Sequence, residues 1–149
     1  MRTDEEYMRV ALAQAAEAKA DGEWPFGAAI VKGDTVVAQN RRREGKLKTV
    51  LAHAEMHAID DACRKLGRTD LSDCTIYCTN EPCLMCAAAI FQAKIPRVVI
   101  GASRTDLAGL VRQRKFHIDN LADDSGYQPA IVRNVLREDV LRLFADITK

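Results

Sequence analysis

Two short segments with metal-ligating side chains constrain this chain more than any other feature. His53 and Glu55 stand two positions apart, and Cys83 and Cys86 stand three positions apart directly after Pro82. One imidazole and two thiols suit zinc, and a zinc ion held by three protein ligands keeps one position for water. A metal bound in this way lowers the pKa of that water and makes it a nucleophile near neutral pH. The pattern therefore predicts one zinc ion per chain, with His53, Cys83 and Cys86 as its ligands.

Glu55 is the carboxylate that such a metal does not need, and it is placed to carry protons in general acid–base catalysis. Positions i and i+2 point apart in a regular helix, so we expect His53 to lie at the irregular entry of a helix. Cys83 and Cys86 fall in the first turn of another helix, where the helix dipole favours thiolates. A lone pair of cysteines is also typical of a redox pair or of a structural zinc site. A structural site needs a fourth ligand, for which His57 is the best-placed candidate, but the presence of Glu55 favours catalysis.

Composition indicates one ordinary globular domain, residues 1–149, with 48% hydrophobic and 29% charged residues. The formal net charge of +1 provides no overall basic field for nucleic acid. We expect no membrane partner, since no run approaches the roughly 18 apolar residues of a membrane span, and the polar start lacks the features of a signal peptide. The five cysteines are an odd number, which argues against a disulfide framework and predicts a cytoplasmic location.

Hydrophobic periodicity predicts alternating helices and strands. This order favours an α/β fold, a three-layer α/β/α sandwich around a mixed five-stranded sheet. The segment 83–93 is apolar nearly all round and should be largely buried, whereas 40–51 should be a polar loop. We expect helices at 4–20, 53–66, 83–93, 106–115 and 135–147, and strands at 28–31, 35–39, 74–79, 97–101 and 116–118.

These motifs resemble those of the cytidine and deoxycytidylate deaminase superfamily, in its branch of nucleobase and tRNA deaminases. The resemblance extends from the first helix to about Gly101 and includes the segments 25–28, 53–55 and 81–86 together with Asn40. It implies a cytidine deaminase-like fold and a zinc-dependent hydrolysis that converts an exocyclic amine to a carbonyl and releases ammonia. It also implies that the substrate base contacts Asn40, Phe26 and Ala54. Members of this branch are commonly homodimers, so a homodimer is expected here.

Two aspartates discriminate between substrates within this branch. Asp106 lies in a stretch similar to bacterial guanine deaminase, and Asp146 lies in a C-terminal stretch similar to fungal-type cytosine deaminase. A buried aspartate accepts hydrogen bonds from an exocyclic amine and is left unpaired by a carbonyl analogue. The resemblance thus favours a small cytosine-like or guanine-like nucleobase or related amino-heterocycle as the substrate, with a slight preference for cytosine.

Two other functions are open from the sequence. A tRNA adenosine-to-inosine deaminase fits the basic residues at 41–43, but the near-neutral charge and the stretch after Gly101 make nucleic acid the less favoured partner. A catalytically silent zinc-binding scaffold fits the ligands alone. Such a scaffold has no need for Glu55, which is why the sequence favours an enzyme.

Overall fold

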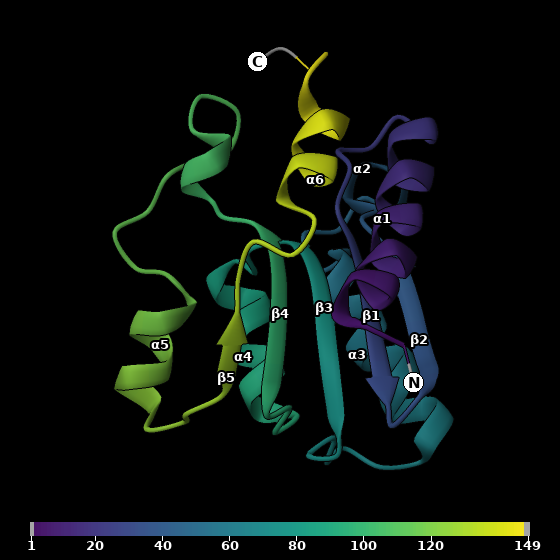
Figure 1. Cartoon of the computed structure of the whole chain (residues 1–149), viewed down its shortest axis with the longest axis vertical. Coiled ribbons are helices and arrows are strands. Elements are labelled where there is room, and N and C mark those ends of the chain that lie inside the picture. The colour runs from purple at the N-terminus through teal and green to yellow at the C-terminus, as the bar shows by residue number, and fades with distance from the viewer. Residues whose placement is uncertain (1, 148–149) are drawn as a thin grey trace.

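The centre of the fold is a mixed sheet with the strand order β2-β1-β3-β4-β5 (Figure 1). The computed structural model describes residues 2–147. β1 pairs antiparallel with both β2 and β3, whereas β3, β4 and β5 run parallel. The carboxyl ends of these three strands therefore meet at one edge of the sheet. The strands are β1 (Gly27–Lys32), β2 (Thr35–Arg41), β3 (Cys74–Asn80), β4 (Arg97–Ala102) and β5 (Ala130–Val132).

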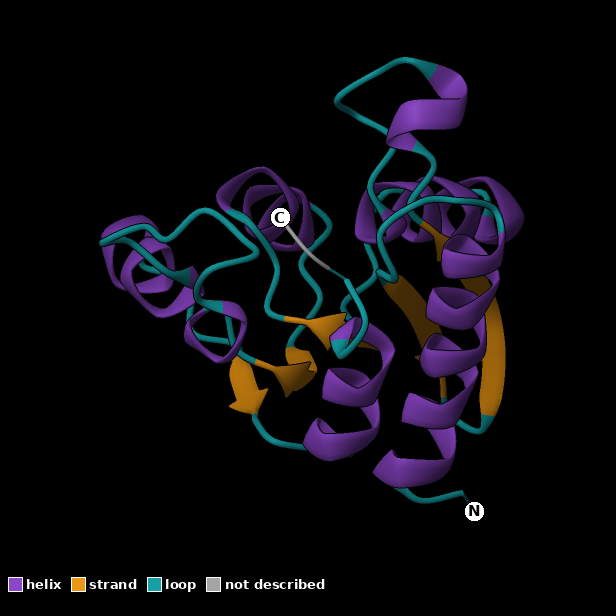
Figure 2. Cartoon of the chain, turned by 90° about the horizontal axis from the view of Figure 1, so that it is seen from above, coloured by secondary structure: helices purple, strands orange, loops and turns teal. Residues whose placement is uncertain are grey.

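Helices cover both faces of this sheet, and the view from above separates the three layers (Figure 2). α1 and α6 pack on one face, and α3, α4 and α5 pack on the other. The predicted α/β sandwich with a mixed five-stranded sheet is confirmed. The helices are α1 (Asp4–Ala20), α2 (Glu44–Leu47), α3 (Ala54–Leu66), α4 (Leu84–Gln92), α5 (Ile118–Ser125) and α6 (Arg137–Phe144), together with the 3₁₀ turn η1 (Thr105–Leu107).

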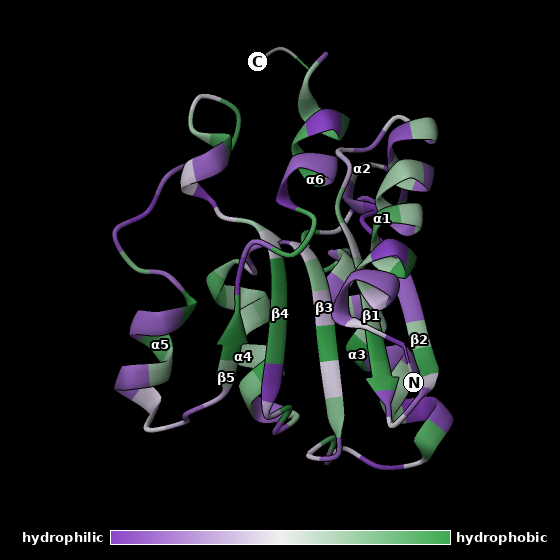
Figure 3. Ribbon diagram, viewed as in Figure 1, coloured by the Kyte–Doolittle hydropathy of each residue, from purple (hydrophilic) through white to green (hydrophobic). Residues whose placement is uncertain are grey.

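The strands divide their side chains between the two layers, as the two-residue period of a strand requires. Ile30 and Ile76 pack against α3 and α4, whereas Val31 and Tyr77 pack against α1. Both faces of the central strands are thus buried, and Figure 3 shows the hydrophobic colour concentrated on β1, β3 and β4. In the part of the chain that the structure describes, no helix combines the length and apolarity needed to cross a membrane.

The segment after β4 differs from the sequence prediction. The expected helix at 106–115 is wrong, since only η1 forms and Gly109 then takes a positive φ of 93°. The expected strand at 116–118 is also wrong, because His117 begins α5 through a capping box with Asn120. The fifth strand is instead 130–132, which pairs with β4 from Arg97↔Ala130 onward.

Two smaller differences concern which residues are buried, and a third concerns secondary structure. The deepest positions of α3 are small alanines such as Ala58 and Ala62, while the larger Ile59 and Cys63 are only half-buried. α4 is less buried than expected, because Ala88 is exposed. The predicted loop at 40–51 contains the short helix α2, and its first two residues belong to β2.

Candidate active site

The start of α3 and the start of α4 bring the predicted metal ligands together. His53 is the N-cap of α3 and has extended backbone angles, φ −88° and ψ 151°, which confirms the predicted irregular entry. Cys83 is the N-cap of α4 and is likewise extended, and Cys86 lies in the first turn of that helix. Because α4 follows β3 directly, the two cysteines lie at the carboxyl end of that strand.

The distances between these side chains fit a zinc ion. Nδ1 of His53 lies 3.7 Å from Sγ of Cys83 and 3.6 Å from Sγ of Cys86. The three ligand atoms all lie within 4.8 Å of one another. Tetrahedral zinc with ordinary Zn–N and Zn–S bonds separates its nitrogen and sulfur ligands by about 3.5 Å. The donor set and the spacing therefore both match the predicted site.

Glu44 fixes the orientation of the histidine. Nε2 of His53 lies 3.1 Å from a carboxylate oxygen of Glu44, so the ring can donate Nε2–H to Glu44 and leave Nδ1 free for the metal. The same carboxylate pairs with Arg42 at 3.3 Å, and the guanidinium of Arg42 lies over the ring of Phe26. Sequence reasoning missed Glu44, and the only signal in the sequence is a carboxylate nine positions before the histidine.

The protonation states of the site follow from burial and close contacts. Burial raises the pKa of Glu55 to about 7, with the negative charge of Cys83 as a further cause. A hydrogen bond from Cys86 lowers the pKa of the Cys83 thiol to about 3. The Cys83 thiolate in turn raises the pKa of Cys86. One thiolate is thus present before any metal binds, and Glu55 can exchange a proton near neutral pH.

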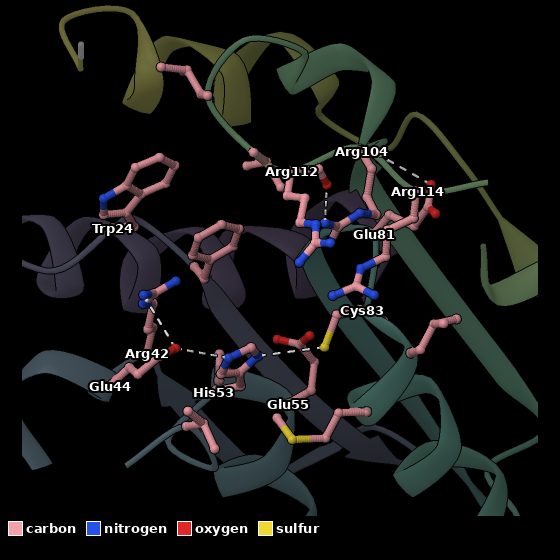
Figure 4. A pocket seen from close by; sticks show the side chains of 17 residues that line it. Trp24, Arg42, Glu44, His53, Glu55, Glu81, Cys83, Arg104, Arg112 and Arg114 are labelled. Carbon is pink, nitrogen blue, oxygen red and sulfur yellow. Dashed lines mark hydrogen bonds and ion pairs between the residues drawn. The ribbon is translucent and has the colours of Figure 1, made fainter. Parts of the chain in front are cut away.

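A cavity of about 730 Å³ opens above the metal ligands (Figure 4). His53, Cys83 and Glu55 lie on one wall of this pocket, which is also lined by Ala54 and the rings of Trp24 and Phe26. The two rings are nearly parallel, with their centroids 6.4 Å apart. Phe26 and Ala54 thus line the cavity beside the metal ligands, and their contact with a substrate base stays a prediction. The pocket also contains four arginines, namely Arg42, Arg104, Arg112 and Arg114.

Asn40 does not line this pocket. It belongs to β2 rather than to a loop, and its Nδ2 donates a hydrogen bond to Asp61 of α3 at 2.8 Å. The hydrogen bond shows that the side chain of Asn40 faces α3, whereas Arg42, which follows the end of β2, lines the pocket.

The two aspartates expected to read the substrate amine also lie outside the pocket lining. Asp106 accepts a hydrogen bond from the backbone N–H of Ser103 and pairs with Arg137 at 2.9 Å, which ties η1 to α6. Asp146 pairs with Lys19 of α1 at 2.6 Å. Each carboxylate is thus engaged in joining elements of the fold.

Glu81, the first residue of the motif segment 81–86, is a buried carboxylate at the edge of the pocket, and the sequence indicated no role for its side chain. One of its oxygens lies 2.5 Å from Nδ1 of His117, and the other lies 3.1 Å from the guanidinium of Arg133. His117, remote in sequence, is thus close to the metal-binding segment in space. The contacts attach α5 and the chain after β5 to the segment that carries Cys83.

Residues 1–102 match the family model described as the cytidine and deoxycytidylate deaminase zinc-binding region. The chain belongs to this family. It is a zinc-dependent deaminase, a hydrolase acting on C–N bonds, and His53, Cys83 and Cys86 are its zinc ligands.

Relatives of this deaminase act on more than one kind of substrate. It is 35% identical over 146 residues to the tRNA-specific adenosine deaminase of Bacillus subtilis, covering 93% of this chain and 84% of that protein. A solved structure from a study of A-to-I editing by tRNA:A34 deaminases matches with a TM-score of 0.81 and 30% identity, covering 93% of this chain and 98% of that one. The structure of guanine deaminase from Bacillus subtilis matches with a TM-score of 0.69 and 37% identity, covering 72% of this chain and 69% of that one.

Proposed function

We propose that this deaminase converts adenosine to inosine in tRNA and releases ammonia. The observation that carries the proposal is the 35% identity to a tRNA-specific adenosine deaminase over 93% of the chain. The aspartates that favoured a free nucleobase lie outside the pocket lining. A cavity of about 730 Å³ is also far larger than a single base, and falls in the range of sites that hold larger ligands.

Glu55 is the proton carrier in the proposed reaction. When zinc is bound, it supplies an activated water as the nucleophile. Glu55 is buried beside the ligands and can accept a proton from that water and pass it to the ring nitrogen as the new C–O bond forms. It can then take the proton of the new hydroxyl group and give it to the amine, which leaves as ammonia while the carbonyl forms. The neighbouring rings of Trp24 and Phe26 offer an apolar wall for the base.

Guanine deamination is the second candidate. The observation that favours it is the 37% identity to guanine deaminase over 72% of the chain. A free purine fits the same aromatic wall and the same proton carrier, so the two candidates differ in whether the base enters attached to RNA.

A substrate panel tests the proposal. Zinc-loaded protein is incubated with a tRNA anticodon stem-loop containing adenosine, and separately with adenosine, guanine, cytosine and cytidine. We expect inosine in the digested stem-loop and matching ammonia, and no product with the Glu55→Gln variant, whose amide has the same shape but cannot carry the proton. Ammonia from a free base or nucleoside, without inosine in the RNA, would overturn the proposal. Turnover of guanine alone would establish the second candidate.

A further inference from the structure

One wall of the pocket carries three arginines. Arg104, Arg112 and Arg114 all line the cavity and come from the segment that follows β4. Figure 4 shows them together on the side of the pocket opposite Trp24. Among residues 2–147, no carboxylate pairs with any of the three, although most other arginines near the site have such a partner.

The carboxylates of the pocket do not offset this charge, because each is engaged elsewhere. Glu44 pairs with His53 and Arg42. Glu81 pairs with Arg133 and His117. Glu55 is the buried proton carrier. The pocket is therefore positive along one wall, even though the whole chain has a formal net charge of only +1.

Hydrogen bonds within the segment hold this wall in place. The guanidinium of Arg104 donates to the backbone carbonyl of Arg112. The side-chain amide of Gln113 donates to the carbonyl of Arg104 at 2.8 Å and to that of Val111 at 2.9 Å. Nε of Arg104 is buried and has no hydrogen-bond partner. A buried, unpaired guanidinium N–H is costly unless it meets an acceptor.

We infer that Arg104, Arg112 and Arg114 bind backbone phosphates of the RNA that flank the target nucleoside. Arginine guanidinium groups match phosphate oxygens in charge and geometry, and the aromatic wall at Trp24 and Phe26 is left for the base. Since β3 and β4 are parallel, the arginines and the cysteine ligands lie at the same edge of the sheet. The inference rests on the proposed function: the arginine wall contacts the phosphates of the RNA substrate, and the aromatic wall contacts its base.

Binding of a fluorescently labelled anticodon stem-loop tests this inference without turnover when the Glu55→Gln protein is used as the background. Arg112→Gln and Arg114→Gln each remove one charge from the wall. Arg64→Gln is the matched control, because Arg64 is exposed on α3 and pairs with Asp60 on the same helix. We expect each pocket variant to weaken binding by about tenfold and to lower the slope of log affinity against log salt by about 1, as a lost phosphate contact does. The control should change neither quantity.

The outcomes separate this inference from the proposed function. Pocket variants that bind RNA as the Arg64→Gln control does, with an unchanged salt slope, would overturn the inference even if the wild-type protein makes inosine. Arginine-dependent binding of RNA, together with wild-type protein that makes no inosine, would support the inference and contradict the proposed function. Thermal unfolding midpoints of the variants show whether a loss of binding reflects a loss of fold.

Discussion

His53 has two roles, one for each ring nitrogen. Nδ1 faces both cysteines, and Nε2 meets Glu44. A carboxylate that accepts a hydrogen bond from the ring nitrogen not bound to the metal fixes the tautomer of the histidine and raises its basicity as a ligand. Glu44 is thus a positioning residue, since it acts on the metal through the histidine.

Replacing Glu44 should weaken zinc binding. We expect Glu44→Ala to raise the zinc dissociation constant by about 10- to 100-fold, because removal of such a partner typically has an effect of this size. Glu44→Gln keeps an oxygen that can accept the same hydrogen bond, so its affinity for zinc should fall less than that of Glu44→Ala. Competition with a coloured chelator measures both constants. An Ala variant that holds zinc as tightly as the wild type would contradict the role.

At the scale of single residues, the sequence predicts what depends on local spacing. The ligands and Glu55 stand at short separations that fix how they enter their helices, so His53 at a helix entry could be foreseen. The partners of Asn40, Asp106 and Asp146 could not, because each depends on which element packs beside it. Asp146, for example, meets a lysine 127 positions earlier in the chain.

At the scale of elements, close packing of β1 on α1 determines which residue begins the strand. A Cβ added to Gly27 would lie 2.1 Å from the backbone oxygen of Ala11 and 2.6 Å from the backbone nitrogen of Ala15. The backbone of α1 cannot move aside as a flexible side chain can, so position 27 accepts only glycine.

Gly27→Ala should therefore destabilise the fold by on the order of 3 kcal/mol, as overpacking of a rigid core does. Gly45→Ala is a matched control, because its added Cβ meets only the carboxylate tip of Glu23 at 3.0 Å. Urea unfolding measures both changes. A Gly27→Ala protein as stable as the control would show that the strand and helix can separate at little cost.

Asp4 joins the first turn of α1 to two strands. It accepts hydrogen bonds from Tyr77 of β3 and from Arg97 of β4, and the bond from Arg97 lowers the pKa of its carboxyl below 3.8. A depressed carboxyl pKa contributes stability that is present above the unfolded-state pKa and is lost as the pH falls through the folded-state value.

We therefore expect Asp4→Asn to destabilise the protein at pH 7, by no more than about 1 kcal/mol because the pair is partly exposed. The difference from the wild type should shrink as the pH falls below about 4. Urea unfolding of both proteins at pH 7 and pH 3 measures it. A difference that is constant over this range would contradict the ion pair as its cause.

Elements with strong periodicity were predicted well, including the helix expected at 135–147, which forms as α6, whereas those between β4 and α6 were not. The strands β1, β3 and β4 are apolar runs buried on both faces, which the sequence displays directly. β5 has only three residues and pairs along one edge, so its pairing rather than its composition defines it. The meeting of Arg104, Arg112 and Arg114 at the pocket could not be predicted either, because an irregular segment has no period that indicates where its side chains point.

At the scale of the whole molecule, the zinc site joins α3 to α4 across the face of the sheet. A metal that binds only the folded chain stabilises it. We expect chelation of zinc to lower the thermal unfolding midpoint and restored zinc to return it, as calorimetry would show. Cys83→Ser should abolish the response, while Cys63→Ser, at a cysteine outside the site, should retain it. A midpoint that chelation leaves unchanged would contradict a zinc ion bound between the helices.

The expected homodimer stays a prediction, which sedimentation at micromolar concentration would test. The proposed reaction is a hydrolysis in which water replaces the exocyclic amine of adenosine in RNA. Deamination of the stem-loop in ¹⁸O-labelled water tests this reaction, with mass spectrometry of the released nucleosides. We expect inosine with one ¹⁸O atom per molecule and one ammonia per inosine from zinc-loaded protein, and neither product from Glu55→Gln protein. Inosine without the label, or labelled product from the Glu55→Gln variant at the wild-type rate, would contradict hydrolysis with Glu55 as the proton carrier.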